Sequence, residues 1–131
     1  MSTLRHEPRW WLEVAAGGAV GTAARAGLLW LAPTQPGAWP ATIFAENVLG
    51  ALLLGLLLGR LDRSGAPRWL RSPFFSTGAL GSFTTFSNLA WDVSATLPTA
   101  PVLAVGYAAA SLLLGLAAAG AGWWLGRRWG R

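Results

Sequence analysis

The sequence contains no cysteine and no lysine, and it has a single histidine. Without cysteine there are no disulfides, no thiolate metal ligands and no cysteine nucleophile. The one histidine, His6, lies in the polar N-terminal stretch, so a histidine-based catalytic dyad or metal site has almost nothing to be built from. Because no nucleophile, base and orienting group come together in the chain, we expect that it is not an enzyme.

Charged residues are also scarce. Of the 131 residues, 11% are charged and 53% are hydrophobic, which is too apolar for a soluble domain of this size and indicates a lipid bilayer as the surroundings. The basic pI of about 11.6 is a feature of nucleic-acid binders, but nine of the ten arginines lie in short stretches between or outside the apolar runs. That distribution indicates membrane topology, and we expect no nucleic-acid partner.

Four apolar segments are long enough to cross the hydrocarbon core, which requires about 20 residues per helix. They cover residues 10–31, 41–59, 69–97 and 100–126, with prolines and glycines in the short connections. We therefore expect one all-α membrane domain of four transmembrane helices over residues 1–131. Tryptophans cluster near the ends of these spans, as in an interfacial aromatic belt.

The arginines outside the spans are confined to three segments. They are Arg5 and Arg9 before the first span, Arg60, Arg63, Arg68 and Arg71 between the second and third, and Arg127, Arg128 and Arg131 at the end. The other two connections contain none. By the positive-inside rule, we expect both termini and the middle connection to face the cytoplasm, in a multi-pass protein of the cell membrane.

Charged and amide side chains inside a span are costly and usually face a cavity or a partner. Glu13 lies near the end of its span, where snorkelling to the interface is a sufficient explanation. Arg25 and Glu46 pair with each other across helices or serve the function directly, and the sequence leaves both roles open.

Asn47 shares a helix face with Ala51 and Gly55, spaced by four residues, and Gly59 continues the row. Such a row of small residues lets another helix approach closely, which places the Asn47 amide against a packed interface or a narrow pore. Its NH2 group can donate two hydrogen bonds to an anion without adding net charge.

The fourth span carries a second polar pair. Tyr107 and Ser111 are four residues apart, so their hydroxyls share one helix face. Hydroxyls in membrane helices commonly form hydrogen bonds between helices, and pore lining is the alternative.

The third span contains the run GALGSFTTFS at residues 78–87. Glycine, serine and threonine make up six of these ten residues, so we expect the helix to be broken at mid-membrane. Irregular backbone at that depth is tolerated only where it is buried in protein or lines a cavity. Freed carbonyls there can hold a cation, and the hydroxyls of Thr84, Thr85 and Ser87 add donors for an anion or acceptors for a cation.

The string GSFTTFS at residues 81–87 resembles the third-span motif of the Fluc/CrcB fluoride channels, commonly Gly-Gly-hydrophobic-Thr-Thr-Phe-Ser. Further matches fall in the family's order in the other three spans. They are Gly17, Gly18, Gly21 and Arg25 in the first span, Asn47 and Gly50 in the second, and Tyr107 and Ser111 in the fourth.

The resemblance implies a fluoride-specific ion channel that exports cytoplasmic fluoride passively and so reduces fluoride toxicity. It implies an antiparallel, dual-topology dimer with two narrow pores and a structural sodium ion (Na+), which is not transported, at the dimer centre. By motif position, the backbone carbonyls of Gly81 and Thr84 would bind that sodium.

The resemblance also implies a fluoride pathway. Asn47 would donate hydrogen bonds to fluoride, Phe86 would offer the positive edge of its ring, and Arg25 would attract anions near a vestibule or brace the bundle. Fluoride is tightly hydrated, so a filter must replace its water with closely spaced donors and ring edges. The expected pathway residues are Asn47, Phe86, Thr85, Ser87, Tyr107, Ser111, Phe83 and Arg25.

The sequence departs from the family in two ways. The second pore phenylalanine of the family corresponds to Leu89, which has no ring edge to offer, so one pore side is impaired or Phe83 partly substitutes. A dual-topology homodimer also needs a weak charge bias, whereas nine arginines here lie on one side. We therefore predict one half of a two-chain pair whose partner inserts with the opposite orientation, and a homodimer remains the alternative.

Two other interpretations compete with the fluoride channel. A small multidrug-resistance exporter also has four short spans, and its proton-coupling carboxylate would be Glu13. That class gives no reason for a broken third helix. A noncatalytic assembly subunit of a larger membrane complex is the third interpretation.

Overall fold

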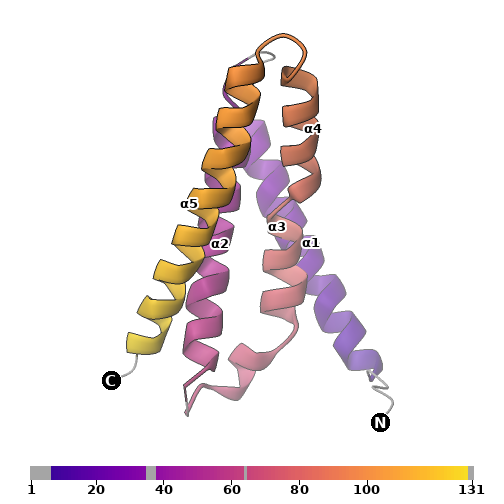
Figure 1. Cartoon of the computed structure of the whole chain (residues 1–131). Helices are drawn as coiled ribbons and strands as arrows, with labels where there is room; N and C mark the ends of the chain where they lie inside the picture. Colours follow the sequence, from indigo (N-terminus) through magenta and orange to yellow (C-terminus); the bar gives the residue numbers. More distant parts are fainter. Residues whose placement is uncertain (1–6, 35–37, 64, 130–131) are drawn as a thin grey trace, which may run out of the picture.

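The computed structural model describes residues 7–34, 38–63 and 65–129, and within them the regular structure is entirely helical (Figure 1). The expected all-α class is confirmed. Arg5, His6 and Arg131 lie outside the described residues. The elements in chain order are α1 (Pro8–Leu31), α2 (Ala41–Leu61), the 3-10 helix η1 (Arg68–Arg71), the π-helix η2 (Phe74–Leu80), α3 (Gly81–Phe83), α4 (Phe86–Thr96) and α5 (Pro101–Arg128).

Within the described residues, α1, α2 and α5 are the helices long and apolar enough to cross a membrane, with mean hydropathies of 1.3, 1.9 and 2.1. They occupy the segments expected as the first, second and fourth spans. Pro8 and Pro101 lie in the first turns of α1 and α5, where a backbone N–H would have no intrahelical acceptor, so its absence in proline costs no helical hydrogen bond. Long apolar runs that begin at a proline therefore account for α1 and α5.

The third expected span, residues 69–97, is divided into η1, η2, α3 and α4. Between α3 and α4 the backbone is extended at Thr84 (φ −77°, ψ 151°) and at Thr85 (φ −145°, ψ 114°). The peptide groups at these two residues lie outside both helical pieces. Their hydrogen-bonding partners therefore have to come from elsewhere in the molecule.

α2 and α5 run parallel and pack backbone against backbone. A Cβ added at Gly55 would overlap the carbonyl oxygen of Ala119, and one added at Gly59 would overlap that of Trp123. From the other helix, a Cβ at Gly122 would overlap the α2 backbone. The close approach expected along the small-residue row of α2 is confirmed.

α1 packs in the same parallel manner against the first half of the divided segment. A Cβ added at Gly17 would overlap the carbonyl oxygen of Phe74, and one added at Gly21 would overlap that of Ala79. Two closely packed parallel pairs, α1 with η2 and α3, and α2 with α5, therefore make up the bundle.

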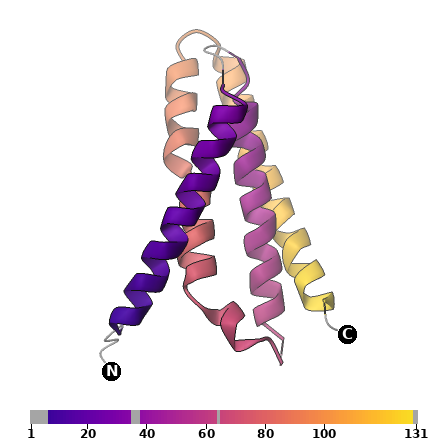
Figure 2. The same ribbon diagram turned by 180° about the vertical axis from the view of Figure 1, so that it is seen from behind.

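The three arginine-bearing segments lie at one end of the bundle (Figures 1 and 2). They are the start of α1, the segment from the end of α2 through η1, and the end of α5. At this end Arg127 pairs with Asp62 at 3.3 Å, and the Arg128 guanidinium lies 3.6 Å from the ring centre of Trp124. The charge asymmetry of the sequence is therefore an asymmetry between the two ends of the fold.

The parallel α2–α5 contact predicts a difference between two glycines of the same helix. Gly122→Ala adds a methyl group against the α2 backbone, whereas Gly115→Ala adds one where no atom lies within 4 Å. Both changes gain the same helix propensity, so only Gly122→Ala should destabilise, by about 1–3 kcal/mol as for other overpacked contacts. Thermal unfolding of the two variants in detergent measures this, and equal melting temperatures would contradict the backbone-to-backbone packing.

Candidate functional site

The side chain of Asn47 on α2 is hydrogen-bonded to the backbone of Thr85. Its Nδ2 donates to Thr85 O at 3.1 Å, and its Oδ1 accepts from Thr85 N at 2.8 Å. Thr85 is only 6% exposed, so without this amide one donor and one acceptor would be buried unpaired. Asn47 therefore replaces the helical hydrogen bonds at the point where the chain leaves α3 and enters α4.

This link and the Thr85 hydroxyl together change the bonding of two nearby carbonyls. In a continuous α-helix, the carbonyl of Gly81 would accept from the N–H of Thr85, and that of Thr84 from the N–H of Asn88. Here the Thr85 N–H donates to Asn47, and the Asn88 N–H donates to Thr85 Oγ1 at 3.2 Å. The carbonyls of Gly81 and Thr84 are thereby released from the helical pattern, and they are the two that the family resemblance assigns to a cation.

The threonine and serine hydroxyls at the break are engaged locally. Thr85 caps the N-terminus of α4 through its hydrogen bond from Asn88, and its hydroxyl lies 3.1 Å from that of Ser87. The hydroxyl of Thr84 donates to Leu80 O at 3.0 Å. These contacts fix the ends of α3 and α4. A threonine just before a helix is a known capping signal, so the cap at Thr85 could have been predicted from the sequence.

An open groove of about 300 Å³, the Asn47 groove, lies between α2, α5 and the divided segment. It brings together both expected cation ligands, four expected fluoride-pathway residues and Leu89. The lining residues are Asn47, Gly50, Ala51, Leu54, Ser76, Leu80, Gly81, Thr84, Thr85, Phe86, Leu89 and Ser111. Residues from three spans that are far apart in the sequence therefore meet in one groove.

Four expected pathway residues do not line this groove, namely Phe83, Ser87, Tyr107 and Arg25. Phe83 is buried and packs beside Gly50. Phe83 therefore does not share the groove position of Leu89, and the substitution of Phe83 for the missing ring there, an alternative drawn from the sequence, is not supported. Tyr107 is 2% exposed, and its hydroxyl donates to Asp92 at 3.4 Å. It lies one helical turn from Ser111, which does line the groove.

Glu46 is the most deeply buried charged residue among the described ones, with 1% of its surface exposed. Within the described residues, neither of its carboxylate oxygens has a hydrogen-bond partner. No ion pair joins Glu46 to Arg25. The direct pairing of Arg25 with Glu46 that was considered from the sequence is therefore not present.

Glu13 is held at the arginine-bearing end of the bundle. It accepts from Arg9 Nε at 2.9 Å and from Ser72 Oγ at 2.7 Å, which ties the start of α1 to the residue after η1. A proton-coupled multidrug exporter needs a carboxylate that is free to exchange its proton inside the membrane. The two partners of Glu13 give this side chain a structural role instead.

The chain is similar to proteins of one family over most of its length. The family described as CrcB-like protein, camphor resistance (CrcB), matches residues 12–123. A fluoride-specific ion channel FluC of Deinococcus radiodurans is 46% identical over 121 residues, which cover 90% of this chain and 95% of the relative. FluC 2 of Bacillus subtilis is 43% identical over 113 residues, 86% and 83% of the two chains. FluC of Hyphomonas neptunium is 40% identical over 121 residues, 89% and 94%.

The link between Asn47 and Thr85 predicts a large loss of stability on substitution. Asn47→Leu leaves the N–H and the C=O of Thr85 without partners, at about 1–3 kcal/mol for each buried group. Asn88→Leu is the matched control, because the Asn88 side chain makes no hydrogen bond to a described residue. Detergent unfolding of both variants measures the difference. Equal stabilities would mean that the Asn47 amide does not sustain the break.

Proposed function

Because this chain belongs to the CrcB-like family, we propose that it is a fluoride-specific channel that lets cytoplasmic fluoride leave the cell passively and so limits fluoride toxicity. It is a multi-pass membrane protein by its apolar helices and its channel relatives. The observation that carries the proposal is the Asn47 groove, because polar and aromatic groups from separate spans converge there around a break in the backbone.

Fluoride contacts the groove through neutral donors in this proposal. One N–H of the Asn47 side chain is used by Thr85, and the second makes no hydrogen bond to a described residue. Ser111, whose buried hydroxyl has no hydrogen-bond partner among the described residues, and Phe86, which has a positive ring edge, line the same groove. Neutral donors favour conduction, because a fixed positive charge in the filter would hold the anion too tightly to release it.

The remaining expected residues extend this pathway. Tyr107 continues the track one turn beyond Ser111 on α5, and Arg25 raises the local anion concentration from its half-buried place on α1. The hydroxyls of Thr85 and Ser87 polarise one another beside the groove, and Phe83 supports the break from the protein interior. We assign these five residues supporting roles and give the direct contacts with fluoride to Asn47, Phe86 and Ser111.

The carbonyl oxygens at the break are suitable ligands for a sodium ion. Gly81 and Thr84 line the groove, and their carbonyls are released from helical hydrogen bonding. Broken membrane helices hold sodium through such oxygens. The described residues contain no cluster of three or more His, Asp or Glu side chains that would compete for a metal. When bound, sodium would supply a fixed positive charge that neutralises the exposed carbonyl dipoles.

A second chain is needed to complete the site in this proposal. Phe86 is 75% exposed, and the Asn47 groove is open. The polar groups of this groove must be covered by protein or water if they lie at membrane depth. An antiparallel copy would cover both and add two more carbonyls to the sodium site. Because all the spans' flanking arginines lie on one side, we propose that the partner is a homologous chain of opposite orientation.

The direct test is ion efflux from liposomes that contain the purified chain. With its partner chain, we expect fluoride efflux without chloride efflux, and slower fluoride efflux when sodium is removed. With this chain alone, we expect fluoride efflux to be weak. Strong efflux from the chain alone would overturn the two-chain arrangement, and equal efflux of chloride and fluoride would overturn the fluoride assignment.

A pair of substitutions on α4 controls for folding in the same assay. Phe86→Leu removes a ring edge from the groove and should lower fluoride efflux about 2- to 10-fold, the factor that about 0.5–1.5 kcal/mol of aromatic interaction is worth. Trp91→Leu removes another exposed ring of the same helix that does not line the groove, and should leave efflux unchanged. An equal loss in both variants would remove Phe86 from the pathway.

A further inference from the structure

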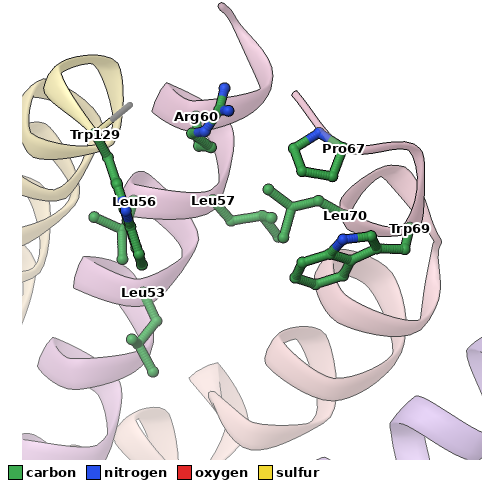
Figure 3. Close-up of a pocket in the computed structure, with 8 residues that line it drawn as sticks. All are labelled: Leu53, Leu56, Leu57, Arg60, Pro67, Trp69, Leu70 and Trp129. Atoms are coloured by element: carbon green, nitrogen blue, oxygen red, sulfur yellow. The ribbon is translucent and has the colours of Figure 1, made fainter. Parts of the chain in front are cut away.

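A second groove lies at the arginine-bearing end of the bundle, separate from the Asn47 groove (Figure 3). It has a volume of about 360 Å³ and shares no lining residue with the Asn47 groove. Leu53, Leu56 and Leu57 of α2 form its apolar wall, and Arg60 stands at one end of it. Pro67, Trp69, Leu70 and Trp129 complete the lining.

No carboxylate in the described part of the chain neutralises the positive charge of Arg60 at the mouth of this groove. Arg60 donates one hydrogen bond from Nη2 to the Gly65 carbonyl at 3.3 Å and forms no ion pair with a described carboxylate. The nearest acidic residue along the chain, Asp62, is already paired with Arg127. A guanidinium has five N–H donors in a planar fork, so Arg60 retains donors for an anion such as phosphate.

The rest of the groove suits a hydrocarbon chain. Its leucine wall belongs to a helix that is apolar enough to cross the membrane, and Leu53 is 39% exposed at its far end. Trp69 and Trp129 flank the groove on opposite sides and are 64% and 66% exposed, as rings at the level of lipid headgroups are. An apolar groove that opens beside a cation at the membrane interface matches an amphiphile with an anionic headgroup.

We propose that this groove binds an anionic phospholipid, with one acyl chain along Leu53, Leu56 and Leu57 and the phosphate on Arg60. Basic pockets between membrane helices are recognised sites for anionic headgroups. Charge complementarity favours this occupant over a zwitterionic lipid, since Arg63, Arg68 and Arg71 add positive charge on the same connection. The bound lipid would bridge η1 and the end of α5 to α2 and stabilise their packing, at a site separate from the ion pathway.

Native mass spectrometry of the purified full chain tests this site. The protein is released from micelles that contain equal amounts of phosphatidylglycerol and phosphatidylcholine with identical acyl chains. We expect the bound lipid to be phosphatidylglycerol in at least about fivefold excess. Arg60→Gln should reduce this preference about fivefold, the factor that corresponds to about 1 kcal/mol per arginine. Arg128→Gln, at the same end but outside the groove, should reduce it far less.

Quenching by brominated lipids locates the bound lipid without relying on Arg60. Dibrominated phosphatidylglycerol should quench the tryptophan fluorescence of the native protein more than dibrominated phosphatidylcholine does. Trp69→Phe should remove part of that difference. Three results would overturn the proposal. They are equal binding of both lipids, equal effects of Arg60→Gln and Arg128→Gln, and a Trp69 shielded from both brominated lipids, which would mean that a second protein chain covers the groove.

Discussion

Two hydrogen bonds between the Asn47 side chain and the Thr85 backbone support the rest of the site. They pair the N–H and C=O of a buried residue that belongs to neither α3 nor α4. With that N–H engaged, the carbonyl of Gly81 is released from helical hydrogen bonding, and with the Thr85 hydroxyl capping α4, so is the carbonyl of Thr84. One amide on α2 therefore keeps a break open in a segment that would otherwise close into a helix or leave buried groups unpaired.

That amide is placed accurately because the helices around it pack through their backbones. Gly55 and Gly59 bring α2 against α5, and Gly17 and Gly21 bring α1 against η2 and α3. Contacts between main chains leave little freedom for sliding or rotation, since any added side chain would overlap a carbonyl oxygen. The small residues thus fix the height and rotation of α2, and with them the position of Asn47. The same geometry explains how so few polar residues can define a site in an otherwise apolar bundle.

The sequence predicted the features that depend on local pattern. The length of the apolar runs predicted the three long helices. The four-residue spacing of small residues predicted the face of α2 that packs closely and carries Asn47. The high content of glycine, serine and threonine predicted irregular backbone near Thr85. It could not predict features that depend on tertiary neighbours. The amide of Asn47 was expected to serve an anion, and its first partner proved to be the backbone of another span. Phe83 and Glu46 were judged by residue type, while their burial follows from how the helices cross.

The conformation of Thr84 and Thr85 in a membrane shows whether the Asn47 amide holds a break in the third span. Carbon chemical shifts distinguish extended from helical threonine, and the protein in lipid bilayers can be labelled at threonine and assigned by Thr84→Ser and Thr85→Ser. We expect extended values for both residues in the native protein and a shift of Thr85 toward helical or averaged values when Asn47 is replaced. Helical values for both in the native protein would contradict it, because an unbroken helix has no free carbonyls at Gly81 and Thr84.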